Sequence, residues 1–207
     1  MRHNRITSVA LAIALVLLSG LVSPRLPGRW VVVVHAVFGA VLAGVTRAPL
    51  GLRPPALQRG LRTGAAAAAV VASGVAASTA LPAVRSAMRK RRLPDAPAWW
   101  LLVRIPLGTV WAEEASYRGA LGHLAAEAFG PARGRLLQSA AFGLSHIADA
   151  RAAGEPVVGT VVTTGVAGWV FARLAERSGS LVAPMLAHLA VNEAGALAAL
   201  AVQRGRC

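Results

Sequence analysis

The chain has 207 residues, of which 56% are hydrophobic and only 14% are charged, and its mean hydropathy is +0.57. Soluble domains carry about a quarter charged residues, so too little polar material is left to cover a core of this size. The composition excludes a disordered chain, which needs low hydrophobicity. It also excludes a disulfide scaffold, because the only cysteine is Cys207. We therefore predict an integral membrane protein.

The formal net charge is +14, from 22 basic and 8 acidic residues. The basic residues fall mainly between apolar segments, around positions 47–62 and 85–92. This is the pattern of loops that lie against anionic lipid headgroups. No aromatic residues interleave with the basic ones, and no nucleic-acid motif is present. We expect membrane lipid as a partner and no nucleic acid.

A membrane-spanning helix needs roughly 20 apolar residues, and apolar segments of about this kind follow one another along the chain. The sequence predicts them at 6–23, 30–46, 64–81, 99–129, 135–147, 156–174 and 181–202. We predict an all-α, polytopic membrane helix bundle with about seven transmembrane segments, within a range of six to eight. The first is expected to be an uncleaved span, because it lacks an A-x-A site and Pro24 stands where cleavage would fall.

A basic stretch at 82–97 separates two parts of the chain, and it predicts a linker or a short interfacial helix. We expect N-terminal membrane helices and this linker over 1–97, and a four-segment membrane core over 98–203. The third segment is rich in Ala, Gly and Ser, a composition that favours close helix packing inside a bundle. The fourth would span roughly 45 Å as a helix, so it should tilt, bend or kink near Pro106.

Ionisable groups inside a bilayer cost about 3 kcal/mol or more each, so they are candidates for function. Glu114 and Arg118 are four residues apart in the fourth segment, share a helix face and can pair. Glu113 is rotated by about 100° from Glu114 and is left without a local partner. One carboxylate would then be structural and the other available for chemistry. The alternative is a helix that ends at the interface with two solvated glutamates.

Two further polar pairs lie in the later segments. Phe142 and His146 share a helix face, and the alternative to a functional His146 is a packing residue hydrogen-bonded by Ser145. His188 and Asn192 are four apart and point into the same space, which indicates a cavity facing the bundle. The alternative for this second pair is an interhelical hydrogen bond that holds the bundle together.

Other polar residues of the apolar segments are assigned no chemistry. His35 has no polar neighbour at helical spacing, so we expect it to pack or to lie at the interface. His123 and Glu127 are four apart and should form a surface pair. Arg104 should extend toward the interface near Trp99.

The motifs E-E-x-x-x-R, F-x-x-x-H and H-x-x-x-N follow in this order on successive apolar segments. This ordered set resembles the signature of the CPBP intramembrane proteases, also called the CAAX-prenyl-protease-2 or Abi family. The matching residues are Glu113, Glu114, Arg118, Phe142, His146, His188 and Asn192. The resemblance covers about 98–202, and the first half of the chain matches only as generic membrane helices.

The resemblance implies a membrane endopeptidase, which we expect in the bacterial plasma membrane. Glu113 and His146 would hold and activate the attacking water, while His188 and Asn192 would stabilise the oxyanion. The other three motif residues would hold the site in shape. The substrate would be a membrane-associated protein, of which prenylated CAAX proteins are one class.

Glu113, His146 and His188 also make a His₂Glu set that zinc could use with an open fourth position. The chain contains no H-E-x-x-H, and the family's better-supported interpretation is a metal-free glutamate protease. We therefore expect no cofactor. Two other functions stay open: a non-catalytic membrane immunity or partner-binding protein on the same scaffold, and a small transporter or channel that uses the polar cavity.

Overall fold

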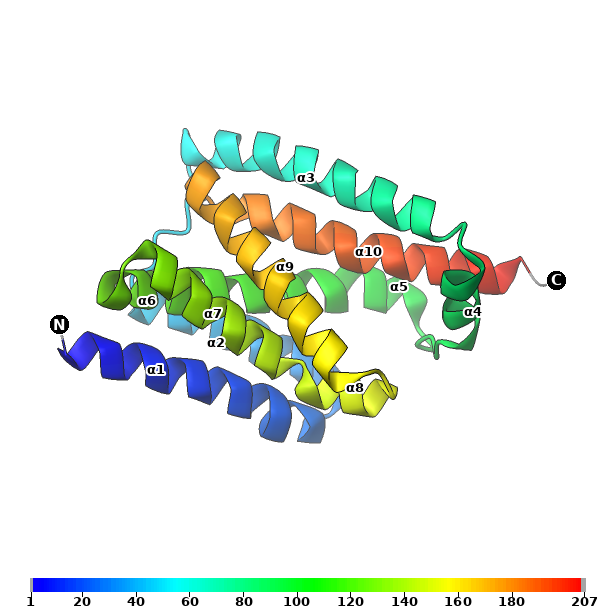
Figure 1. Ribbon diagram of the computed structural model, residues 1–207, viewed down its shortest axis with the longest axis horizontal. Helices are drawn as coiled ribbons and strands as arrows, with labels where there is room; N and C mark the ends of the chain where they lie inside the picture. Colours follow the sequence, from blue (N-terminus) through cyan, green and yellow to red (C-terminus); the bar gives the residue numbers. More distant parts are fainter. Residues whose placement is uncertain (1, 206–207) are drawn as a thin grey trace.

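The computed structural model describes residues 2–205, with side chains from residue 4 on, and no β-strand occurs among these residues. The helices are α1 (Arg2–Leu17), α2 (Gly28–Val45), α3 (Ala56–Ser78), α4 (Pro82–Lys90), α5 (Pro97–Trp99), α6 (Gly122–Phe129), α7 (Pro131–Ser145), α8 (Ile147–Ala153), α9 (Val157–Ser178) and α10 (Val182–Arg204). Between them lie the π-helical segments η1 (Leu18–Val22), η3 (Trp100–Trp111) and η4 (Glu114–Leu121) and the short 3₁₀ turn η2 (Ser23–Arg25). The helices form an elongated bundle with α3 and α10 along one edge and α1 along the other (Figure 1).

Within residues 2–205, five helices are long and apolar enough to cross a membrane. They are Asn4–Arg25, Gly28–Val45, Ala56–Ser78, Val157–Ser178 and Val182–Arg204. These five correspond to the first, second, third, sixth and seventh predicted segments. The prediction of an all-α polytopic membrane bundle is confirmed. The fourth and fifth predicted segments form a long central helix and the shorter α7.

The long central helix runs without a break over 97–129, from α5 through η3 and η4 to α6. It ends at Phe129, where the sequence pattern predicts its end. Pro106 lies inside π-helical η3, and the wider π turn accommodates a residue that has no N–H to donate. Every residue of η4 is buried. The bundle therefore encloses the charged part of this helix and shields it from lipid.

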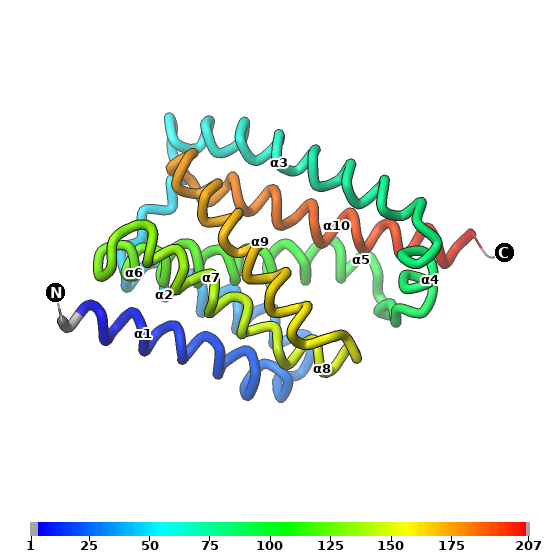
Figure 2. Tube along the Cα trace, viewed as in Figure 1, coloured from blue at the N-terminus to red at the C-terminus, as the bar shows by residue number. Residues whose placement is uncertain are grey.

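The helix α3 packs on α10 through two glycines, as the tube view in Figure 2 allows the reader to follow. Gly60 faces Ser180 and Gly64 faces Ala183, and a Cβ added to Gly64 would lie 2.9 Å from Ala183 Cα. Small residues four apart let two helix backbones approach closely in a membrane. These glycines are the buried residues of α3, so the predicted close packing holds on this one face.

Two local features differ from, or sharpen, the sequence-based prediction. The basic stretch 82–97 contains a helix, α4, which is one of the two forms predicted for it. The fifth segment ends at Ser145, so His146 does not lie inside an apolar helix as predicted. It stands at the junction of α7 and α8 with φ −88° and ψ 3°, outside the α-helical region. Apolar residues continue past this junction, so hydrophobicity alone does not mark the break.

Candidate active site

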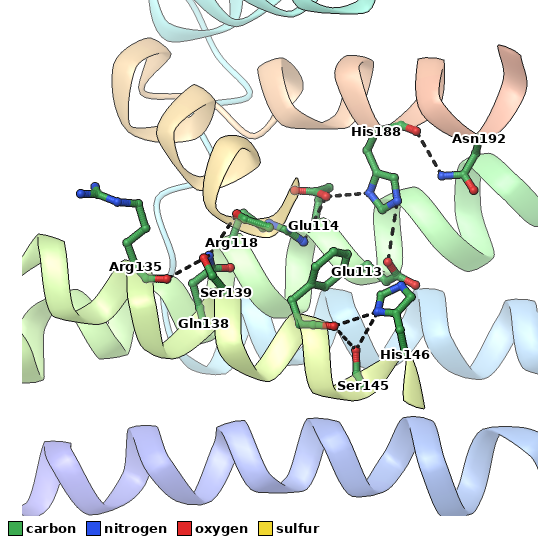
Figure 3. Close-up of polar contacts among 12 residues, drawn as sticks. Glu113, Glu114, Arg118, Arg135, Gln138, Ser139, Ser145, His146, His188 and Asn192 are labelled. Carbon is green, nitrogen blue, oxygen red and sulfur yellow. Dashed lines mark hydrogen bonds and ion pairs between the residues drawn. The ribbon is translucent and has the colours of Figure 1, made fainter. Parts of the chain in front are cut away.

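The polar motif residues come from three parts of the bundle, and their side chains project into one region between the helices (Figure 3). The central helix supplies the Glu113–Arg118 stretch, the α7–α8 junction supplies His146, and α10 supplies His188 and Asn192. Segments far apart in the sequence therefore bring the predicted residues together.

His188 lies between the two neighbouring carboxylates. Its Nδ1 is 2.8 Å from Glu114 Oε1, and its Nε2 is 3.8 Å from Glu113 Oε2. A carboxylate only accepts hydrogen bonds, so His188 Nδ1 carries the hydrogen and donates it to Glu114. The imidazole is buried and stacks on the Phe171 ring, with ring centroids 5.0 Å apart. This arrangement fixes the orientation of Nε2 toward Glu113.

Glu114 and Arg118 form the ion pair that their spacing predicts. Arg118 Nη1 lies 3.2 Å from Glu114 Oε1, and both side chains are fully buried. The Arg118 nitrogens make no hydrogen bond within the described chain, so the pair is held by charge rather than by hydrogen-bond geometry. The guanidinium carbon also lies 3.9 Å from the centroid of the Phe142 ring and 5.1 Å from that of Phe171. A carboxylate and two aromatic faces thus compensate this buried cation.

His146 contacts both a backbone carbonyl and the neighbouring Ser145 hydroxyl. Its Nδ1 lies 2.8 Å from the carbonyl oxygen of Phe142, whereas Ser145 Oγ is 3.4 Å away and itself donates to the same carbonyl. The Ser145 contact of the packing alternative is thus present, but the contact with the Phe142 carbonyl is the shorter one. Because a carbonyl accepts, Nδ1 is the protonated nitrogen, and Nε2 of a neutral ring carries the lone pair. In Figure 3 the His146 ring points toward the Glu113 carboxylate.

Asn192 is half-buried and is engaged by its own helix. Its Nδ2 donates to the carbonyl oxygen of His188 at 3.1 Å. An asparagine amide has two N–H donors, so one remains for another acceptor. Asn192 and His188 are therefore linked by a hydrogen bond from the Asn192 side chain to the His188 backbone, and not by a bond between their two side chains.

The Phe142 ring contacts three aromatic side chains of the site. It makes edge-to-face contacts with Tyr117, His146 and His188, at centroid distances of 5.1, 4.7 and 6.1 Å. Gly168 of α9 leaves room for this ring, because a Cβ there would lie 3.0 Å from Phe142 Cδ1. Sequence reasoning assigns no site role to Gly168 or Phe171. The signal that could have found them is their three-residue spacing, which places both on the face of α9 that meets the site.

The zinc alternative requires three gathered ligands. Among residues 2–205, no group of three or more His, Cys, Asp or Glu side chains is arranged to hold a metal ion. Glu113 and His188 face each other, but the set of Glu113, His146 and His188 is not assembled as a metal centre in this structure.

Residues 95–194 match the family described as type II CAAX prenyl endopeptidase Rce1-like. This part of the chain is therefore similar to the CAAX protease family. The CAAX protease region contains all seven motif residues, so the resemblance to the CPBP proteases is confirmed. No curated protein and no solved structure matches the chain. The family and the apolar helices together establish an integral membrane protein of a membrane-protease family, while its location in a bacterial plasma membrane and the division of the chain at residue 97 stay predictions.

Proposed function

We propose that the protein is an intramembrane endopeptidase that hydrolyses a peptide bond of a membrane-associated protein. The observation that carries this proposal is the pair of adjacent carboxylates on the two edges of His188. Glu114 is fully buried, and its Oε1 contacts both Arg118 and His188, whereas the Glu113 side chain is 28% exposed and its Oε2 lies 3.8 Å from His188 Nε2. Glu113 is therefore the carboxylate that is free to act on a water molecule.

In the proposed reaction, a water molecule bound between Glu113 and His146 attacks the carbonyl carbon of the scissile bond. Glu113 takes a proton from this water as the new carbon–oxygen bond forms. When the carbon–nitrogen bond breaks, a proton reaches the leaving amine from the Glu113–His146 pair. The lone pair on His146 Nε2, implied by the Nδ1 bond to Phe142, supports this role.

The oxyanion formed by the attack needs donors. The second N–H of Asn192 can donate without any proton transfer, as an oxyanion donor should. His188 can donate from Nε2 only when the ring carries both protons, because its Nδ1 hydrogen is committed to Glu114. In this proposal Glu114, Arg118 and Phe142 are positioning residues that set the direction of His188.

We place the enzyme in the metal-free glutamate class. This placement follows the glutamate-type interpretation that the resemblance to the CPBP proteases implies. Cleavage should persist after dialysis against EDTA and 1,10-phenanthroline. A loss of activity that added Zn²⁺ restores would instead assign the metalloprotease class.

The family description gives a substrate class, namely prenylated CAAX proteins, and we propose a substrate of this type. The test uses the full chain in lipid nanodiscs with a farnesylated CAAX reporter peptide. Glu113→Gln should reduce cleavage by about 10²–10⁴-fold, the usual contribution of a general base. Glu127→Gln is the matched control, since Glu127 pairs with His123 at 3.5 Å on the surface. Full cleavage by Glu113→Gln would contradict the proposal and favour a non-catalytic, partner-binding role.

The natural substrate can be found by comparing membrane peptides from cells that carry the wild type or Glu113→Ala. Peptides ending at a cleavage site should be present only with the wild type. Identical peptide sets in the two strains would count against proteolysis.

A further inference from the structure

A small cavity of about 50 Å³ lies against Glu113, between the central helix and the N-terminal helices. Its polar lining consists of Ser19, His35, Glu113, Ser116 and Tyr117, and its apolar lining of Leu15, Leu18, Phe38 and Ala112. A cavity needs roughly 10–15 Å³ and two or more polar partners to hold one water molecule. By size and by lining, this cavity suits water.

Two buried polar atoms of residues that line or adjoin this cavity fall short of full hydrogen bonding. Tyr117 Oη and Glu113 Oε2 are both buried, and neither makes a hydrogen bond within the described chain. The Tyr117 side chain is only 3% exposed, so bulk solvent does not satisfy its hydroxyl. A buried polar group without a partner costs about 1–3 kcal/mol. Ser19 and Ser145 lie near the Tyr117 hydroxyl, and a water molecule in the adjacent cavity would complete its hydrogen bonding and remove this cost.

The N-terminal half of the chain builds one wall of the cavity. Ser19 lies in π-helical η1, and single π turns inside α-helices often occur at functional sites. His35 of α2, which the sequence predicts to pack or to lie at the interface, has a polar partner in the neighbouring segment, because its Nε2 lies 2.8 Å from the Oγ of Ser23 in η2. This bond ties the two N-terminal helices together at the cavity. The CAAX protease region, 95–194, contains neither Ser19 nor His35.

We propose that this cavity is a water-binding site and that Ser19 and His35 are positioning residues that hold its water against Glu113. The site completes the hydrogen bonding of Tyr117 and stores water next to the carboxylate. Its effect on catalysis rests on the proposed peptidase function, whereas the presence of the water does not.

The first test fills the cavity. Ser19→Leu should displace the water and lower kcat at least tenfold with little change in KM, and Ser19→Ala, which keeps the space, should lower it less. Val37→Phe adds bulk to the same region of α2 on a residue that is 56% exposed, and it is the matched control. A kcat for Ser19→Leu equal to that of Val37→Phe would overturn the positioning role. A similar melting temperature for the two variants excludes unfolding as the cause.

The second test does not depend on activity. X-ray hydroxyl-radical footprinting modifies buried side chains that lie next to trapped water, and Tyr117 is the only tyrosine in the chain. Tyr117 should be modified in the wild type and several-fold more slowly in Ser19→Leu, while Phe171 modification stays the same in both. Equal Tyr117 modification in the two proteins would overturn the water site. Labelling of Tyr117 in a wild type that cleaves no substrate would support the water site and contradict the peptidase.

Discussion

His188 donates a hydrogen bond from Nδ1 to Glu114 Oε1 at 2.8 Å. This bond joins α10 to the middle of the central helix and turns Nε2 toward Glu113. Two glutamates that are neighbours in the sequence thereby act on opposite edges of one imidazole. Glu114 faces a fully buried cation, and Glu113 lines the small cavity beside the N-terminal helices.

The Glu114–Arg118 pair should be costly to break on one side. Glu114→Leu leaves Arg118 buried without its counterion, and we expect the free energy of unfolding to fall by about 3–5 kcal/mol. The double variant Glu114→Leu/Arg118→Leu should recover most of this loss but no peptidase activity, because His188 then has no acceptor. Unfolding in nanodiscs, followed by circular dichroism, measures the stabilities. A single variant as stable as the wild type would contradict the importance of the pair.

Asn192 should contribute to the rate rather than to substrate binding. Asn192→Ala removes the proposed neutral oxyanion donor, which typically costs about 3 kcal/mol, or about 10²-fold in kcat. KM should change little. The control is Asn4→Ala, because Asn4 is the only other asparagine and is exposed on α1. An unchanged kcat for Asn192→Ala would show that another group stabilises the oxyanion.

Gly168 should be essential for the position of Phe142. Gly168→Val places methyl groups within the space of the Phe142 ring and of Arg118 Nη2, which lies 3.4 Å from an added Cβ. Overpacking of this kind costs about 1–3 kcal/mol, and the displaced ring should lower kcat as well. Gly159→Ala on the same helix is the control, since its Cβ would meet ordinary contact at 3.7 Å. Assays of cleavage and of melting temperature separate the two effects.

Larger side chains should destabilise the contact between α3 and α10 only on the face of α3 that carries Gly64. Gly64→Val should separate the helices and lower the free energy of unfolding by about 1–3 kcal/mol. Gly74→Ala on the same helix meets nothing within 4 Å, so it should be neutral or stabilise α3 by up to about 1 kcal/mol through helix propensity. Thermal unfolding compares the two, and equal losses would contradict the proposed packing face.

Apolar runs predict most of the helices to within several residues, because the bilayer demands long apolar helices. Spacing along a single helix also predicts the pairing of Glu114 with Arg118 and of His123 with Glu127, since residues four apart share a face. Contacts between segments escape this reasoning. The bond between Ser23 and His35 joins two helices, so no spacing within either one reveals it.

The pattern of side chains also fails to predict which backbone groups accept hydrogen bonds and where a helix ends. Every residue has a backbone carbonyl, so the sequence does not indicate that the Phe142 carbonyl is the one that accepts a hydrogen bond from His146. That partner is known only from the path of the backbone in three dimensions. The end of α7 at Ser145 follows from dihedral angles, because apolar residues continue beyond it. The long π-helical winding around Pro106 likewise has no side-chain signature beyond the proline itself.

The packing of α3 against α10 has a consequence for biosynthesis. The ribosome makes α3 well before α10, so the Gly60 and Gly64 face stays open to lipid until the later helix enters the membrane. That later helix also brings His188 and Asn192. A growing chain therefore carries its two carboxylates before the imidazole of His188, and in the proposed mechanism it would have no peptidase activity at that stage. Packing of α10 onto α3 therefore completes the bundle and brings His188 and Asn192 to the two glutamates at the same time.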